Sequence, residues 1–296
     1  MQSSAALSIG LPAVLCIIML GLGLSLKLDD FLRVLRQPRT VLIGLLCQIV
    51  ILPILCFGLT YASGLPPAIA VGMMLLAASP GGTSATLYTH LARGDVALSI
   101  TLTALTSALS ILTVPLIANM ALDQFYGESA MVYLELAQVA QIFAIAVVPA
   151  LVGVFVQSRY PALAQRLEKP VKILAMVFLV AVVVFALVSQ WSLVAIWGPT
   201  VGVTVLAFNL ISFGVGYFVP RLFRVAERQA IALAMSIGMH NAALVITIAL
   251  SEHMLGNSEM AIPPAAYGLF AYITGGVLGW ILSRRRPIAE TEPTLN

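Results

Sequence analysis

Charged side chains are scarce in this sequence. Asp, Glu, Lys and Arg together make up 9% of its 296 residues, whereas soluble domains carry about 25%. So few charges cannot cover the surface of a water-soluble globule of this size, and 60% of the residues are hydrophobic. The composition therefore excludes a soluble protein and predicts an all-α membrane protein with apolar helices that cross the bilayer.

Residues that carry out enzyme chemistry are also few. The chain has three cysteines and three histidines. Cys16, Cys47 and Cys56 lie in apolar runs without the spacing of a metal site or a disulfide framework. The sequence contains no pairing of histidine with an acidic residue at catalytic spacing and no nucleophile motif. We therefore expect neither an enzyme, nor a cofactor, nor a nucleic-acid partner.

The chain instead has long apolar segments, each long enough to span the hydrocarbon, which takes about 20 residues. Nine such segments cover residues 5–26, 40–62, 67–91, 95–119, 131–156, 171–190, 196–219, 228–251 and 261–283. All 15 Lys and Arg residues fall on one side of the resulting topology. Because positive residues concentrate in cytoplasmic loops, we expect nine transmembrane helices in the cell (inner) membrane, with the N-terminus outside and the C-terminus in the cytoplasm.

Two of the nine segments contain interruptions that disfavour a helix. Residues 79–83 are Ser-Pro-Gly-Gly-Thr, where the proline lacks an N–H group and the glycines have no side chain that favours a helix. Residues 236–241 are Ser-Ile-Gly-Met-His-Asn, a glycine among three polar residues in an apolar segment. We expect both helices to unwind inside the membrane, which is tolerated only where protein or a water-filled cavity satisfies the backbone.

The two interruptions occupy matching positions in two halves of the chain. Residues 1–128 form a first half of four spans with its broken helix at 67–91, and residues 129–296 form a second half of five spans with its broken helix at 228–251. The predicted topology runs these helices in opposite directions. This pattern is typical of an inverted-repeat transporter, whose broken helices mark the binding site. Kinks that serve only packing are the alternative interpretation.

The predicted span at 95–119, which follows the first interruption, carries a row of hydroxyl groups. Ser99, Thr103, Ser107 and Ser110 follow one another at spacings of three and four residues, which places them on one face of a helix. Such a face can contribute oxygen atoms to a binding site. It can equally serve close packing between helices, as small residues do in membranes, and the spacing leaves both interpretations open.

Several motifs resemble those of one transporter family. Residues 79–83 are followed by Leu-Ala-Arg-Gly-Asp-Val-Ala-Leu-Ser at 91–99, and Gly-Met-His-Asn stands at 238–241. In this spacing, and with residues 19–31, the chain resembles a nine-span member of the bile acid:sodium symporter family. The resemblance implies a core domain with two crossing broken helices and a panel domain made of the first, fifth and sixth spans. It also implies an organic anion bound in the cleft between the two domains.

The resemblance further implies two sodium ions at the helix crossing. The positions that match the family's sodium site are Gln48, Ala85, Thr86, Ser99, Thr103, Ser236, Ile237, Met239 and His240. The family's ligand types are kept at Gln48, Ser99 and Thr103. Ser236 stands where the family has a glutamate, and His240 stands where it has a glutamine. Ala85 and Thr86 replace a serine–asparagine pair.

The exchange of the glutamate for Ser236 leaves the coupling ion open, because it removes the only formal negative charge available to the cations. Sodium-coupled secondary transport of a small organic anion by alternating access is one hypothesis. A carrier that is proton-coupled through His240, whose side chain can change charge near physiological pH, or an uncoupled carrier is the alternative. A channel is a more remote one. We expect substrate contacts from Thr83, Ser84, His240 and Asn241, in a monomer or weak homodimer.

Overall fold

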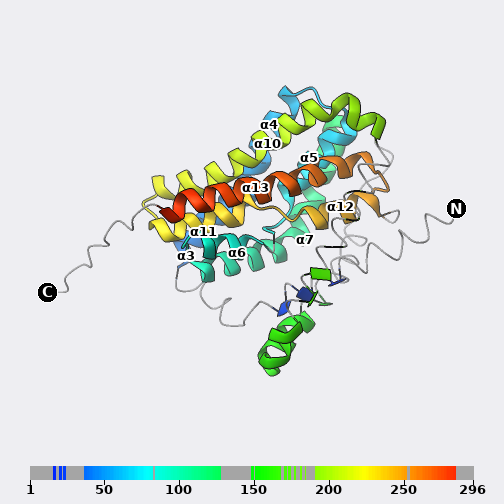
Figure 1. The fold of residues 1–296 in the computed structure, drawn as a ribbon. Coiled ribbons are helices and arrows are strands. Elements are labelled where there is room, and N and C mark those ends of the chain that lie inside the picture. Colours follow the sequence, from blue (N-terminus) through cyan, green and yellow to red (C-terminus); the bar gives the residue numbers. More distant parts are fainter. Residues whose placement is uncertain are drawn as a thin grey trace.

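The structure is a computed structural model. It describes residues 16–17, 20–21, 23–24, 37–82, 84–127, 148–149, 151–167, 170–171, 173–174, 177, 181, 184, 191–251 and 254–284. Its named helices (Figure 1) are α3 (Pro38–Leu46), α4 (Leu52–Ala62), α5 (Pro67–Ala78), α6 (Ala85–Leu91), α7 (Val96–Tyr126), α10 (Trp191–Leu222), α11 (Glu227–Gly238), α12 (Ala242–Leu250) and α13 (Ile262–Arg284). A π-helical stretch, Cys47–Ile51, joins α3 to α4, and a 3-10 turn, Glu259–Ala261, precedes α13. These ranges contain helices and no strand, so the all-α prediction is confirmed for them.

Four of the described helical stretches are long and apolar enough to cross a bilayer. They are Pro38–Ala62, Val96–Tyr126, Ala195–Leu222 and Glu259–Arg284. Each coincides with a predicted span, which supports the membrane class. The spans predicted at 5–26, 131–156 and 171–190 lie largely outside the described residues. The count of nine spans, and the panel domain that three of them would form, therefore stay predictions.

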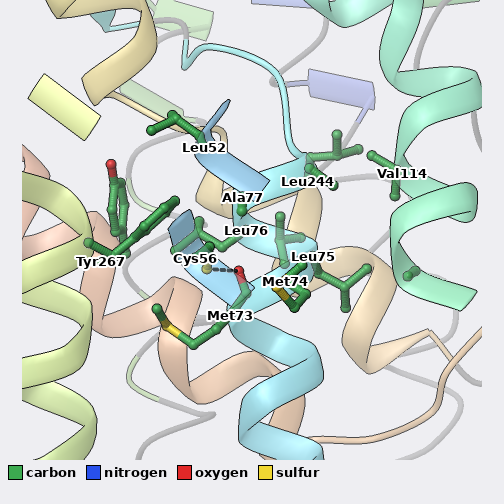
Figure 2. Close-up of a cluster of buried hydrophobic side chains, with 14 of the residues drawn as sticks. Leu52, Cys56, Met73, Met74, Leu75, Leu76, Ala77, Val114, Leu244 and Tyr267 are labelled. Atoms are coloured by element: carbon green, nitrogen blue, oxygen red, sulfur yellow. Dashed lines mark hydrogen bonds between the residues drawn. The ribbon is translucent and has the colours of Figure 1, made fainter. Parts of the chain in front are cut away.

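Helix α5 lies at the centre of the core. Every residue from Ala68 to Ala78 is buried, as expected for a helix that is apolar on all sides. Figure 2 shows its side chains among residues of four neighbouring helices, Leu52 and Cys56 of α4, Val114 of α7, Leu244 of α12 and Tyr267 of α13. The Cys56 thiol donates to the Met73 carbonyl oxygen at 3.4 Å. The cysteine is thus a small core residue, as its apolar surroundings in the sequence predict.

Both predicted interruptions are present. Helix α5 ends at Ala78, Ser79 has an extended backbone with a ψ of 151°, and α6 begins at Ala85. Helix α11 ends at Gly238, and α12 begins at Ala242. Helix α6 packs against α11, and α12 packs against α5 (Figure 1). Each half-helix therefore lies beside a half-helix of the other broken helix.

Candidate functional site

The two interruptions meet and pair through their backbones. Residues 80–82 and 239–241 form an isolated antiparallel bridge centred on Gly81 and His240. The bridge has two backbone hydrogen bonds, from Gly82 N–H to the Met239 carbonyl oxygen and from Asn241 N–H to the Pro80 carbonyl oxygen, the second at 2.9 Å. Buried backbone groups need partners where water is absent. This pairing therefore stabilises two unwound segments inside the protein, and we call it the crossing.

The crossing depends on the absence of a side chain at Gly81. A Cβ atom at this position would lie 2.8 Å from the Ser236 carbonyl oxygen and 3.2 Å from Thr103 Oγ1. The first distance is shorter than real Cβ atoms tolerate, and the neighbouring atom belongs to the backbone. The glycine predicted to unwind the helix thus has a second role, because it lets α7 and α11 approach the bridge.

His240 lies in a chain of side-chain hydrogen bonds. Gln48 Nε2 donates to the Ser79 carbonyl oxygen at 3.0 Å and lies 3.3 Å from His240 Nδ1. An amide nitrogen only donates, so this contact is a hydrogen bond in the tautomer whose Nδ1 carries no proton. The ring proton then lies on Nε2, 3.5 Å from Ser212 Oγ, whose own O–H donates to the Phe208 carbonyl oxygen at 2.8 Å. This order of donors and acceptors fits a neutral imidazole, and Ser79 Oγ also lies 3.5 Å from Nδ1.

Two aromatic rings hold the plane of the His240 ring. Phe208 of α10 stacks on it with a centroid separation of 5.4 Å and an interplanar angle of 22°. Tyr267 of α13 meets it edge-on at 5.3 Å and 68°. Gln48, which faces Nδ1, lies in the π-helical stretch five residues before Pro53. Such local widening of a helix is frequent at functional sites, and here it accompanies the glutamine that reaches the crossing.

The last carbonyl group of α11 is fully occupied by protein donors. The Gly238 carbonyl oxygen accepts from Tyr267 Oη at 2.7 Å and from Asn209 Nδ2 at 3.3 Å. Asn209 Oδ1 in turn accepts from the Thr274 hydroxyl. Donors from α10 and α13 therefore fix the end of the half-helix that leads into the crossing.

On the α7 side, the crossing carries hydroxyl groups. Ser99 Oγ and Ser236 Oγ lie 2.8 Å apart and share a hydrogen bond. The Gly81 N–H donates to Thr106 Oγ1 at 3.4 Å. Ser99 and Thr103 of the predicted hydroxyl row are buried here. Thr106 was not part of that row, although it lies three residues after Thr103 and so shares a helix face with it.

Two buried oxygen atoms at the crossing have no hydrogen-bond partner. They are Gln48 Oε1 and Thr103 Oγ1, on side chains that are 3% and 2% exposed. An unpaired buried polar atom costs about 1–3 kcal/mol, and each such atom in a native structure calls for a physical reason. A cation that binds oxygen provides one, because both atoms can act as ligands.

The four residues predicted to contact the substrate differ in which side-chain groups they can offer to an anion. Thr83 lies outside the described residues. Ser84 is half-buried just before α6. Asn241 caps α12, with its Oδ1 accepting from the Leu244 N–H at 3.1 Å, so its Nδ2 is the group that it can offer to an anion. Both ring nitrogens of His240 face protein partners.

The remaining positions of the expected sodium site contribute less. Ala85 and the Met239 side chain are buried in an apolar cluster with Phe213, and the Met239 carbonyl oxygen accepts from the backbone of the other interruption. The Ile237 side chain belongs to the main core. Thr86 is half-buried on α6. Ala85 has no side-chain oxygen, so the place of the family's serine–asparagine pair is only partly able to bind a cation.

Sequence reasoning missed several residues around His240. Ser212 and Tyr267 were not predicted to take part, and Asn209 was noticeable only as a polar residue in an apolar span. The spacing of Asn209 and Ser212, three residues apart in one helix, is a signal that places both on one face. Nothing in the sequence distinguishes Tyr267 from an ordinary core tyrosine.

Known proteins resemble this chain over most of its length. Residues 12–197 match the model of the Sodium Bile acid symporter family. The chain is 27% identical to an uncharacterized sodium-dependent transporter, YocS, of Bacillus subtilis, over 91% of this chain and 81% of the relative. It is 27% identical to the probable sodium/metabolite cotransporter BASS1 of Arabidopsis thaliana chloroplasts, over 92% of this chain and 66% of the relative.

A mammalian protein is among the relatives as well. The ileal sodium/bile acid cotransporter of Oryctolagus cuniculus is 27% identical over 83% of this chain and 70% of its own length. The family model covers well over half of the present chain. The relatives are transporters and not enzymes, in line with the composition and the motifs. The chain therefore belongs to the sodium bile acid symporter family of membrane transporters.

Proposed function

We propose that this chain is a secondary active transporter that carries a small organic anion by alternating access, with sodium as the coupling ion. The observation that carries the proposal is the crossing of two interrupted helices, beside which two buried oxygen atoms lack partners. Broken helices in secondary transporters bind anionic substrate groups at half-helix N-termini and cations at unwound carbonyls and half-helix C-termini. The crossing brings both kinds of helix end together.

The cation site that we propose uses neutral oxygen ligands. Gln48 Oε1 is held in place because Gln48 Nε2 donates to the Ser79 carbonyl oxygen and faces His240 Nδ1. Thr103 Oγ1 and the paired hydroxyls of Ser99 and Ser236 supply further oxygens. These ligands suit a hard cation such as sodium. The names of the relatives from Bacillus subtilis and Arabidopsis thaliana refer to sodium as well, which supports the same choice.

The anion site that we propose lies where α6 and α12 begin. Asn241 Nδ2 remains available after the side chain caps α12, and Ser84 is half-buried in the other interruption. Thr83, which the sequence places next to Ser84, completes the proposed set. The positive end of the α12 dipole favours a negative group at this position.

The wider architecture belongs to the same proposal. Residues 1–128 and 129–296 would be the two halves of an inverted repeat, in nine spans with the N-terminus outside and the C-terminus in the cytoplasm. The first, fifth and sixth spans would form a panel that moves against the core. Alternating access then follows from rocking of one part against the other around a fixed crossing.

Proton coupling through His240 is the main competitor. In the neutral tautomer with its proton on Nε2, its ring accepts at Nδ1 from Gln48 and donates at Nε2 to Ser212. A second ring proton would place two donors, Gln48 Nε2 and the imidazolium, against each other. The hydrogen-bond order therefore favours the neutral ring and a sodium-coupled mechanism.

Uptake into proteoliposomes tests the proposed function. Purified protein is reconstituted, and the entry of labelled taurocholate, pyruvate and pantoate is measured under an inward sodium gradient, an inward proton gradient, or neither. We expect accumulation of at least one anion under the sodium gradient and none under the proton gradient. Accumulation driven by protons and lost in His240→Gln would contradict sodium coupling, and equal entry under all three conditions would indicate an uncoupled carrier.

A further inference from the structure

In the described part of the chain, none of the buried polar side chains is acidic or basic except His240, which can titrate. They are serine, threonine, asparagine and glutamine residues, and Asp, Glu, Lys and Arg do not occur among them. At the crossing itself, Ser236 bonds to Ser99, and the Gln48 amide nitrogen lies 3.3 Å from His240 Nδ1, so no acidic side chain takes part. The crossing therefore has no charge of its own to balance a bound cation.

A sodium ion at such a site is incompletely stabilised. The oxygens of Gln48 and Thr103 can replace part of its water shell, but neutral dipoles do not cancel a full charge. Placing an unpaired ion in the membrane interior is costly, and such ions are found paired. Burying a charge is tolerated when an opposite charge lies beside it. No described buried side chain supplies this countercharge, and a bound organic anion would supply it.

We propose that the carboxylate of the substrate is this countercharge, so that sodium and the organic anion bind together and cross the membrane as an electrically neutral pair. The inference rests on the proposed function. It adds that the two ligands bind together and that the transported pair has no net charge. The two ligands bind to one crossing, the cation at its oxygens and the anion near Asn241 Nδ2. Each raises the affinity for the other because each cancels the other's charge.

Two consequences distinguish a neutral pair from other forms of sodium coupling. The empty carrier and the loaded carrier both have an uncharged crossing, so the membrane potential does no work on the transport cycle. Sodium also binds weakly when the anion is absent. A carrier with its own carboxylate at the crossing would instead bind sodium before the anion. If more sodium charge than substrate charge crossed in each cycle, transport would depend on the membrane potential.

Accumulation at a clamped potential tests the first consequence. Proteoliposomes receive a fixed sodium gradient, the potential is set with potassium and valinomycin, and the final internal concentration of labelled pyruvate or pantoate is measured. We expect the same accumulation at zero and at inside-negative potential. One net positive charge per cycle would raise it about 50-fold per 100 mV, and that result would overturn the neutral pair.

Sodium binding to the solubilised protein tests the second consequence. Binding of ²²Na⁺ is measured with and without unlabelled pyruvate or pantoate. We expect the anion to lower the sodium concentration for half-saturation at least about tenfold, a coupling typical of linked sites. Equal sodium affinity with and without the transported anion would overturn the proposal.

Substitution of Ser236 sharpens the binding experiment. Ser236→Glu adds a carboxylate beside Ser99, whereas Ser236→Gln adds similar bulk without charge. We expect Ser236→Glu to bind sodium without the anion and Ser236→Gln to need it. If Ser236→Glu does not fold, the wild-type comparison still decides. Failure of every probe to enter under a sodium gradient counts against the proposed function, whereas sodium-driven entry that grows with potential counts against the neutral pair alone.

Discussion

The two interrupted helices meet at one point but are interrupted by different means. The first interruption contains a proline and two glycines, and its described residues Ser79 to Gly82 contribute backbone to the crossing: a carbonyl group that fixes Gln48 and a glycine that allows close approach. The second, Met239 to Asn241, is shorter and contributes side chains: His240 inside the hydrogen-bond chain and Asn241 as a helix cap.

The two interruptions therefore have different roles at the crossing. Gly81 of the first interruption sets how closely the helices approach, and the side chains of the second orient Gln48 and cap α12. We therefore expect a change at Gly81 to act on packing and to impair every activity of the protein. Changes in the second should act on ion and substrate affinity while the fold remains.

The largest effect is expected from Gly81→Ala. The new methyl group would lie 2.8 Å from the Ser236 carbonyl oxygen, and overpacking of this kind costs about 1–3 kcal/mol. We expect both a lower melting temperature in detergent and a loss of uptake at every sodium concentration. Gly58→Ala in α4 is the matched control, because nothing lies within 4 Å of its added Cβ. Full activity of Gly81→Ala would contradict the role of close approach.

A smaller and more selective effect is expected from His240→Leu. Loss of the Nδ1 acceptor leaves one Gln48 N–H unpaired, which costs about 1–3 kcal/mol and frees the amide to reorient. We expect the sodium concentration for half-maximal uptake to rise roughly tenfold, with the protein still folded. His240→Gln keeps an acceptor and should remain near the wild type. A sodium titration that His240→Leu leaves unchanged would show that His240 does not orient Gln48.

The pair of hydroxyls gives the next test, a double-mutant cycle of Ser99→Ala and Ser236→Ala. The two Oγ atoms lie 2.8 Å apart, so removal of either leaves the other without this partner. We expect the sum of the stability losses in the two single variants to exceed the loss in the double variant. The difference, which is the coupling energy, should be about 1 kcal/mol. The measurement is the free energy of unfolding without sodium. Additive losses would indicate that the pair is not formed.

The smallest effect is expected from Tyr267→Phe. This change removes one of the two donors to the Gly238 carbonyl oxygen, and Asn209 Nδ2 remains at 3.3 Å. We expect a loss of about 1 kcal/mol in the free energy of unfolding. The combined variant with Asn209→Leu should lose clearly more, because the carbonyl group then has neither donor. Equal stability of the single and combined variants would show that Tyr267 and Asn209 do not stabilise the end of α11.

The sequence was sufficient for features that depend on local chemistry. Proline and glycine at 79–83 and glycine at 238 predicted both interruptions. The apolar segments predicted the four long helices. These features follow from backbone preferences and from periodicity within one segment.

Features that join distant segments were beyond the sequence. The contact between Gln48 and His240 joins residues 192 positions apart, and that between Ser99 and Ser236 joins residues 137 positions apart. His240 was predicted as a possible proton carrier because its chemistry allows two states. Only the position of a donor beside Nδ1 argues for one of them, and no single-segment pattern contains that information.

The central claim is that the unpartnered oxygens at the crossing serve a sodium ion, and Thr103→Val tests it most directly. The exchange keeps the shape and removes Oγ1, an atom without a hydrogen-bond partner. Thr247→Val in α12 is the control, a buried threonine whose hydroxyl donates to the Ala243 carbonyl oxygen at 2.9 Å.

The measurements are the sodium dependence of uptake and the melting temperature without sodium. For Thr103→Val we expect the half-saturating sodium concentration to rise roughly tenfold, as for a lost buried interaction of about 1.4 kcal/mol, while the sodium-free protein becomes no less stable. For Thr247→Val we expect unchanged sodium dependence. Unchanged sodium dependence in Thr103→Val, together with a loss of sodium-free stability, would contradict the account, because the hydroxyl would then serve the fold and not the ion.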